Sequence, residues 1–280
     1  MCAFSDGLFF MKEIFIDDIR KIQLAMMDFI DALCREKGIR YSLCGGTLLG
    51  AVRHHGYIPW DDDIDIFMLR PDYKRFIEEV GKIGGTRYKI FSPFTDGKYY
   101  YPFAKLCDSS TRILERNDRP LPEMGVYIDI FPVDGLPNEE KKRERYWSRI
   151  KVWKRLNTMV YQKRVNGENS ARRIFRRLMF FLLKPMKPNR LAKYLNALST
   201  EYKVEESEFV AVSIFGYGKK EQLPGSVFSE FEDISFEQKR YRAIKNYDLY
   251  LSNLYGDYMT LPPVEQRQKK HGFQAFVMEE

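Results

Sequence analysis

A cluster of aspartates near residue 60 is the strongest chemical signal in the chain. Asp61, Asp62, Asp63 and Asp65 occupy four of five consecutive positions. Side chains alternate along a strand, so Asp63 and Asp65 of an expected strand over 63–69 point the same way. Two neighbouring carboxylates repel each other unless a cation lies between them. The spacing predicts a site for Mg²⁺ or Mn²⁺, which bind carboxylates and substrate phosphates. A solvated acidic turn is the alternative.

A diglycine turn precedes the acidic cluster. Gly45 and Gly46 end an expected strand over 39–44, and residues 47–53 can form a short helix. A glycine turn followed by a helix exposes backbone N–H groups that can hold a phosphate. We therefore expect Gly45 and Gly46 to contact a phosphorylated substrate.

A third carboxylate stands in an apolar stretch farther along the chain. Residues 126–131 form an expected strand in which Asp129 is the one charged side chain. Burying such an acid is costly unless something pairs with it. Together with the glycine turn, Asp63, Asp65 and Asp129 fit a phosphoryl-transfer site for two metals. Asp129 would complete the second metal site and accept the proton of the attacking hydroxyl.

Several neighbours of these acids allow two interpretations each. Arg53 could clamp a diphosphate through bidentate hydrogen bonds or form a salt bridge to Asp61 or Asp62. Lys105, in a strand pattern, needs a phosphate or an acid as a partner. Trp60 could stack on cytosine or on a quaternary ammonium group, or it could anchor its loop in the core. Asp134 either supports the metal ligands or belongs to the turn after Pro132.

At these residues the sequence resembles the LicD family of phosphotransferases, within the polymerase-β-like nucleotidyltransferase superfamily. Four blocks carry the resemblance: residues 45–66 (GGTLLGAVRHHGYIPWDDDIDI), Lys105-Leu106 with Asp108 and Thr111, residues 125–135 (GVYIDIFPVDG), and Tyr255-Gly256-Asp257-Tyr258 with Leu261-Pro262-Pro263 and His271. The family pattern ends in paired histidines, whereas this chain has Lys270-His271-Gly272. The resemblance implies substrate contacts for Thr47, Arg53, Trp60, Lys105 and His271 beside the two glycines.

The resemblance also implies a fold and an activity. The fold is α+β, with a nucleotidyltransferase-like mixed β-sheet flanked by helices. The activity is transfer of a phosphorylated alcohol from a CDP-linked donor, with CDP-choline favoured, to a hydroxyl of a cell-surface glycan. Phosphoethanolamine, glycerol phosphate and ribitol phosphate are related groups. The acceptor is often carried on a polyprenyl lipid at the cytoplasmic face.

Two other functions compete with this prediction. A nucleotidyltransferase would attack the other phosphorus of an NTP and release pyrophosphate rather than CMP. A nucleic-acid-binding protein without catalysis would use basic side chains alone, and its affinity would fall steeply with salt. An acidic cleft gives a polyanion binder no advantage, so we expect no nucleic-acid partner.

Composition is that of an ordinary globular protein. The chain has 280 residues, 44% hydrophobic and 30% charged, which indicates one large domain or two small ones. The longest wholly apolar run, Leu178 to Leu183, is far shorter than the ~20 residues of a spanning helix. Four cysteines without paired spacing indicate a reducing compartment and no zinc site. No signal peptide is expected, and a cytoplasmic location follows.

Charge is distributed unevenly and divides the chain into three segments. Residues 139–193 contain 18 Lys and Arg against four Glu, a local charge of +14 on a chain whose net charge is +7. We expect a catalytic core over 1–137, a basic helical insert over 138–205, and a segment over 206–280 that completes the catalytic domain. A basic and apolar helix over 171–183 suits peripheral contact with an anionic membrane. The alternative is a helical subdomain packed on the core.

Hydrophobic periodicity predicts the other elements. Helices are expected over 17–37, 71–83, 139–165, 190–202 and 246–255, and strands over 88–91, 100–106 and 209–215. Pro132 is expected to end the strand that carries Asp129, because proline cannot donate to a ladder. Pro185 and Pro188 are expected to end the basic helix.

Overall fold

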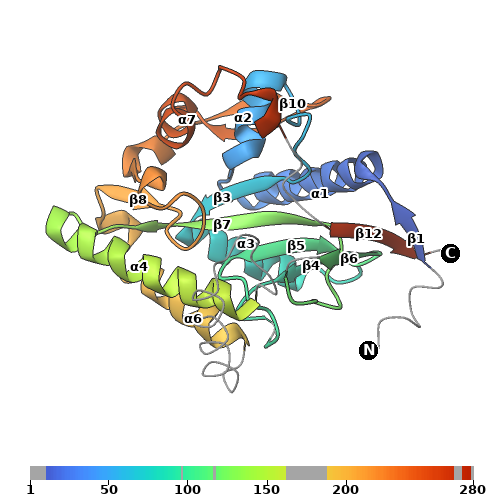
Figure 1. Cartoon of the computed structure of the whole chain (residues 1–280), viewed down its shortest axis with the longest axis horizontal. Helices are drawn as coiled ribbons and strands as arrows, with labels where there is room; N and C mark the ends of the chain where they lie inside the picture. Colours follow the sequence, from blue (N-terminus) through green and yellow to red (C-terminus); the bar gives the residue numbers. More distant parts are fainter. Residues whose placement is uncertain (1–10, 96, 116–117, 162–187, 268–272, 279–280) are drawn as a thin grey trace.

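A mixed β-sheet of seven strands forms the centre of the molecule (Figure 1). The computed structural model describes residues 11–95, 97–115, 118–161, 188–267 and 273–278. The strand order is β2-β3-β7-β5-β4, and β8 and β9 extend the sheet beside β7. The strands are β2 (Ser42–Leu43), β3 (Asp65–Leu69), β4 (Tyr88–Phe91), β5 (Ala104–Asp108), β7 (Tyr127–Gly135), β8 (Phe209–Ala211) and β9 (Leu223–Pro224). β3 and β7 are parallel and the other pairs are antiparallel. The expected α+β class is confirmed.

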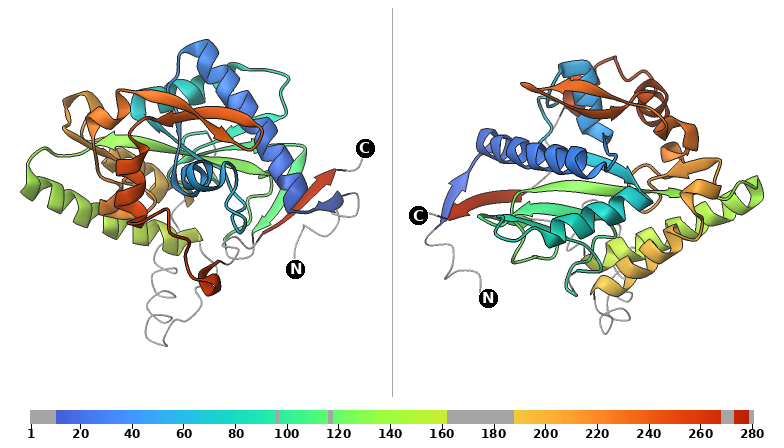
Figure 2. Two further views of the ribbon diagram at one scale, coloured as in Figure 1. Left: turned by 90° about the horizontal axis from the view of Figure 1, so that it is seen from above. Right: turned by 180° about the vertical axis from the view of Figure 1, so that it is seen from behind.

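Helices cover both faces of this sheet. α1 (Ile16–Lys37) lies over one face and α3 (Arg70–Lys82) over the other (Figures 1 and 2). α1 buries its apolar stripe, and Asp17 and Asp18 stand in its first turn, where carboxylates stabilise the positive end of the helix dipole. Gly38 ends the helix in the left-handed region with φ +61°, as its position in the sequence predicts.

The strand that carries Asp129 continues past Pro132, contrary to expectation. β5 pairs with β7 only as far as Ile130, and β8 pairs from Asp134 onward. Pro132 therefore stands between two partner strands, where its missing N–H breaks no antiparallel pair. A second difference concerns the strand expected over 100–106, which begins only at Ala104 as β5. Residues 100–103 are buried but precede this strand.

Two helices of the basic insert fall within the described residues. α4 (Glu140–Tyr161) and α6 (Pro188–Ser199) lie side by side along the sheet (Figures 1 and 2). Pro188 begins α6, because proline is tolerated in a first turn. The helix that Pro185 and Pro188 are expected to end lies outside the described residues. Tyr146 and Ile150 of α4 and Leu195 of α6 are buried in the core. For these two helices the structure agrees with packing on the core; the helix expected over 171–183 lies outside the described residues.

The segment after residue 205 packs against elements from the first part of the chain. α2 (Gly45–His54) contacts α7 (Tyr247–Tyr255) and the hairpin of β10 (Phe231–Phe236) and β11 (Lys239–Ile244). β12 (Phe273–Met278) pairs with β1 (Met11–Ile14) and β6 (Thr111–Glu115) in a separate three-stranded sheet. The division into a catalytic core over 1–137, a basic helical insert over 138–205 and a segment over 206–280 that completes the catalytic domain stays a prediction. Among the described residues, no helix is both long and apolar enough to cross a bilayer.

Candidate active site

Parallel pairing of two strands brings acids from distant parts of the chain together. Asp65, at the start of β3, stands directly opposite Asp129 of β7. Directly paired residues project from the same face of a sheet, so both carboxylates lie on one side. Asp63 precedes β3, which is shorter than the expected strand. One carboxylate oxygen each from Asp61, Asp62 and Asp63 lies within 4.8 Å of the others.

The acidic loop is held by side chains of α1 that the sequence did not single out. Arg20 donates from Nη2 to the carbonyl oxygen of Asp61 at 2.7 Å. Gln23 donates from Nε2 to the carbonyl oxygen of Asp62 at 3.0 Å, and its Oε1 accepts from the Tyr57 hydroxyl at 2.9 Å. These bonds satisfy backbone acceptors of the loop, so its shape does not depend on contacts among the carboxylates themselves.

The diglycine turn lets the beginning of α2 approach the carboxylates closely. Gly45 has φ +54°, and a Cβ at Gly46 would lie 2.5 Å from Asp61 Oδ2. The Gly45 N–H donates to the Tyr250 hydroxyl at 3.2 Å. Thr47, whose contact with substrate was expected, accepts at Oγ1 from the backbone N–H of Asp65 at 2.8 Å. In this structure Thr47 therefore fixes the start of β3.

Several acidic side chains lie near Asp65. Burial raises the pKa of its carboxyl well above the usual value, and Asp63 and Asp129 raise it further. Within the described residues, its buried Oδ1 accepts no hydrogen bond. A buried carboxylate oxygen without a donor, among other carboxylates, has the chemistry of a divalent-cation site. The donor set is all oxygen, which suits Mg²⁺ or Mn²⁺.

Lys105 pairs with the carboxylate of Asp129. The two residues face each other across β5 and β7, and Lys105 Nζ donates to Asp129 Oδ1. Lys105 is only 2% exposed, and its Nζ lies 3.4 Å from the centroid of the Tyr127 ring. Lys105, for which a contact with phosphate was expected, forms an ion pair with Asp129 in the structure. It supplies the partner that buried Asp129 requires.

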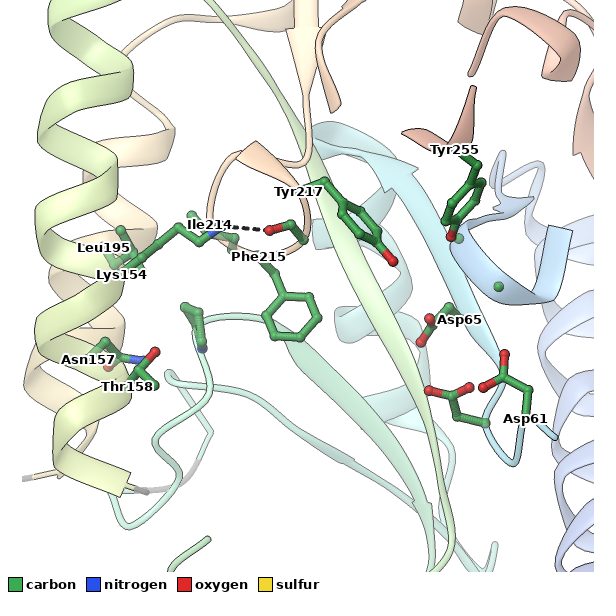
Figure 3. A pocket seen from close by; sticks show the side chains of 15 residues that line it. Asp61, Asp65, Lys154, Asn157, Thr158, Leu195, Ile214, Phe215, Tyr217 and Tyr255 are labelled. Carbon is green, nitrogen blue, oxygen red and sulfur yellow. Dashed lines mark hydrogen bonds between the residues drawn. The ribbon is translucent and has the colours of Figure 1, made fainter. Parts of the chain in front are cut away.

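A cavity of about 360 Å³ opens beside the acids (Figure 3). Its walls come from several elements: Gly45, Gly46, Asp61, Asp63 and Asp65; Pro102; Lys154, Asn157 and Thr158 of α4; Leu195 of α6; Ile214, Phe215, Gly216 and Tyr217 after β8; and Tyr255 of α7. Lys154, Asn157 and Tyr217 had not been selected from the sequence, and Tyr255 had been named only as part of a family motif. The α4 side chains lie across the cavity from Asp61 and Asp65 (Figure 3). We call this space the aspartate cavity.

A buried carboxylate supports the loop that carries Tyr217. Glu221 Oε1 accepts from the Tyr217 N–H at 3.0 Å, and Lys154 Nζ donates to the Gly216 carbonyl at 3.2 Å. Gly216 has φ +69°, and a Cβ there would lie 2.2 Å from Glu221 Oε1. Burial raises the pKa of Glu221 to about 7, against partial compensation by the Tyr217 N–H and Lys154.

Glu221→Gln is expected to remove a pH dependence of stability. Because the folded-state pKa lies above the unfolded value of 4.5, ionising Glu221 destabilises the fold progressively as the pH rises towards 7. The variant should therefore gain stability relative to wild type between pH 5 and 8, by up to about 3 kcal/mol. Urea unfolding across this range measures the difference. Exposed Glu205→Gln is the control, and a pH-independent difference for Glu221→Gln would contradict the assignment.

Two of the expected substrate-binding residues, Arg53 and Trp60, stand outside the lining of the aspartate cavity that the described residues form. Arg53 donates from Nη1 to the carbonyl oxygen of Tyr258 at 2.8 Å. Trp60 packs edge-on against His54, with ring centroids 6.2 Å apart, and Arg267 lies over its ring at 5.5 Å. Among the described residues, the lining of the aspartate cavity includes neither Arg53 nor Trp60. His271 lies outside the described residues.

Comparison with known proteins relates the chain to one family. The family description "LicD/FKTN/FKRP, nucleotidyltransferase domain" matches residues 38–165, which include Asp61, Asp62, Asp63, Asp65 and Asp129. The chain is 32% identical over 278 residues to "Lipopolysaccharide cholinephosphotransferase LicD" of Haemophilus influenzae, covering 96% of this chain and 100% of that protein. A shorter region of 76 residues is 40% identical to "Ribitol 5-phosphate transferase FKRP" of Homo sapiens, covering 26% of this chain and 15% of that protein.

Proposed function

Because the chain belongs to the LicD family of phosphotransferases, we propose that it transfers a phospho-alcohol group to a hydroxyl of a cell-surface glycan. The observation that carries the proposal is the placement of Asp65, which stands opposite Asp129 and lines a cavity of about 360 Å³. The relatives named for cholinephosphate and ribitol 5-phosphate transfer support the reaction class. We propose a CDP-alcohol as donor, with CDP-choline favoured and CMP as the leaving group.

The acids would hold the metal ion, and Asp129 would also accept the proton of the attacking hydroxyl. Asp63, Asp65 and Asp129 are the residues that would hold Mg²⁺ or Mn²⁺. A bound cation would neutralise charge that develops on the phosphoryl oxygens. The acceptor oxygen attacks the phosphorus that carries the alcohol, and the bond from that phosphorus to CMP breaks. The hydroxyl proton passes to Asp129, whose carboxylate is held in place by the ion pair with Lys105.

Two tyrosines support choline as the alcohol. Tyr217 and Tyr255 line the aspartate cavity near Asp65 (Figure 3) and form an edge-to-face pair with ring centroids 5.7 Å apart. Tyr217 is 51% exposed, so part of its ring remains accessible to a ligand. Aromatic faces attract quaternary ammonium groups through the ring quadrupole. A trimethylammonium group beside these rings would place its phosphate close to the acids.

Tyr217→Leu is expected to weaken binding of CDP-choline about tenfold, which is within the usual strength of a cation–π contact. Binding of CDP-glycerol, whose alcohol is neutral, should change much less. Equilibrium binding of both compounds measures the ratio of their dissociation constants. Tyr217→Phe keeps the ring and should keep the wild-type ratio. An unchanged ratio in Tyr217→Leu would exclude Tyr217 from recognition of the alcohol.

A panel of donors tests the proposed reaction itself. The full chain is incubated with CDP-alcohols or NTPs, a glycan acceptor and Mg²⁺ or Mn²⁺, and ³¹P NMR follows the products. CMP from a CDP-alcohol supports the proposal. Pyrophosphate from an NTP would instead support nucleotidyl transfer. Nucleic-acid binding that falls steeply with salt and persists in Asp63→Ala, without turnover of any donor, would support a binding protein.

The sequence also supports a lipid-linked acceptor and peripheral contact with the inner face of the membrane. Arg172, Arg173, Arg176 and Arg177 adjoin the apolar run from Leu178 to Leu183, a composition suited to anionic lipid surfaces. This proposal rests on sequence alone, because the segment lies outside the described residues. Sedimentation of the full chain with anionic and neutral vesicles tests it, and equal sedimentation with both would contradict it.

A further inference from the structure

One wall of the aspartate cavity carries an amide oxygen that has no hydrogen-bond partner among the residues the structure describes. Asn157 of α4 is only 2% exposed and lines the cavity with Lys154 and Thr158. Its Nδ2 donates to the Tyr100 carbonyl at 3.2 Å, which fixes the orientation of the amide. Within the described part of the chain, Asn157 Oδ1 is buried and accepts no hydrogen bond. A buried acceptor without a donor is costly, so a ligand that donates there would gain affinity.

The neighbouring side chains offer the opposite hydrogen-bonding character. The Lys154 ammonium has donors beyond the one it gives to the Gly216 carbonyl (Figure 3), and Thr158 has a hydroxyl. Burial lowers the pKa of Lys154 to about 8, so the side chain is mostly charged at pH 7. This wall of α4 therefore combines one fixed acceptor with two groups able to donate.

An aromatic ring in the same cavity is placed for stacking. Phe215 lies parallel to Phe131, with centroids 5.0 Å apart and planes 8° from parallel, and it also contacts Phe103. Phe131 and Phe103 are buried, whereas Phe215 remains 39% exposed and lines the cavity. A ring supported on one face and accessible on another is a platform for a planar group.

We propose that Asn157, Lys154, Thr158 and Phe215 form the subsite for the pyrimidine base of the nucleotide donor and select cytosine over uracil. Cytosine carries an amino donor beside two acceptors, its ring nitrogen and its carbonyl oxygen. The amino group matches Asn157 Oδ1, and the acceptors match Lys154 and Thr158. Uracil has a carbonyl oxygen in place of the amino group and would set one acceptor against another.

The enclosure of Asn157 favours a base over the glycan acceptor at this wall. A glycan on a lipid carrier continues beyond the sugar that reacts, so it needs an open path. A nucleobase is the terminal group of its ligand and can be surrounded. The acids lie across the cavity from α4 (Figure 3), which leaves the phosphates of the same nucleotide on the side of Asp61 and Asp65. The subsite thereby deepens the proposed function and rests on it.

Equilibrium dialysis of the full chain with CMP and UMP, at fixed Mg²⁺, tests the subsite. Wild type should bind CMP at least about tenfold more tightly than UMP. Asn157→Leu, which keeps the approximate volume but removes the acceptor, should weaken CMP binding about tenfold or more and bring the two affinities close together. Lys154→Met should weaken CMP binding about tenfold. Lys151→Met, one turn earlier and exposed on the same helix, should leave both affinities unchanged.

Several results would overturn the subsite. Equal binding of CMP and UMP by wild type would do so, as would an unchanged preference in folded Asn157→Leu. If Asn157→Leu does not fold, Lys154→Met decides the question. An affinity of Lys154→Met for CMP equal to that of wild type would then overturn the subsite. If Asn157→Leu raises the KM for the glycan but keeps the wild-type preference for CMP over UMP, the wall of α4 binds the glycan instead of the base. Failure of the proposed function is separate: wild type would then transfer from no CDP-alcohol, whatever its base preference.

Discussion

Asp65→Asn will lower the rate of phosphotransfer by about a thousandfold or more while leaving the fold intact. A cation at this site is expected to contribute several kcal/mol of transition-state stabilisation, and each 1.36 kcal/mol is a factor of ten in rate. The substitution keeps the shape of the side chain and removes its charge. Its backbone N–H still donates to Thr47, so the start of β3 should be preserved.

Stability measurements separate this effect from misfolding. Asp65 is partly buried and lies near other carboxylates, so the neutral amide relieves repulsion. Without divalent cation the variant should melt at the wild-type temperature or above it. Added Mg²⁺ or Mn²⁺ should raise the melting temperature of wild type more than that of the variant, because a ligand stabilises the state that binds it. Exposed Asp17→Asn is the matched control, and turnover of Asp65→Asn within tenfold of wild type would refute the assignment.

The second large effect concerns stability alone. Arg70, at the start of α3, forms a buried ion pair with Asp134 of β7, with Nε 2.6 Å from Oδ1. Its Nη1 and Nη2 also donate to Asn196 Oδ1 and Ser199 Oγ of α6, each at 3.1 Å. Arg70→Met should lower the free energy of unfolding by about 3–5 kcal/mol, since Asp134 would be left buried and unpaired. Chemical denaturation provides the measurement.

A double variant distinguishes loss of the pair from loss of packing. Asp134→Leu combined with Arg70→Met removes both charges and should recover much of the stability. Arg149→Met breaks an exposed pair with Glu201 and should cost less than about 1 kcal/mol. If Arg70→Met costs no more than Arg149→Met, the buried pair is not a major contributor. Because the network joins α3, β7 and α6, its loss should also loosen the α4–α6 wall of the aspartate cavity.

Local patterns predicted the elements that position the acids. The extent of α1 followed from its apolar periodicity, the acids of its first turn and Gly38. The meeting of Asp65 and Asp129 was expected from the diglycine turn, the two spaced aspartates and the lone acid of the strand over 126–131, and the register of β3 and β7 places Asp65 and Asp129 together. These features depend on residues close in sequence or on residue types that together indicate one kind of site.

Contacts between distant residues were beyond the reach of the sequence. Asp134 was interpreted as a support for the metal ligands or as a turn residue, but it pairs with Arg70 inside the core. Lys105 was assigned to phosphate from the family resemblance, and nothing in its own strand reveals that Asp129 faces it. Asn157 and Tyr217 carried no motif. Their position in the cavity arises from tertiary packing of α4 and of the loop after β8, which periodicity does not describe.

The pairing of β3 with β7 also limits how this protein can vary in length. Side chains alternate with a period of two, so one residue added inside either strand would turn its carboxylate to the opposite face. The 63 residues between Asp65 and Asp129 include loops that can lengthen or shorten without moving either acid. Among homologous chains, insertions and deletions should therefore gather between the elements and be absent from the two ladder segments.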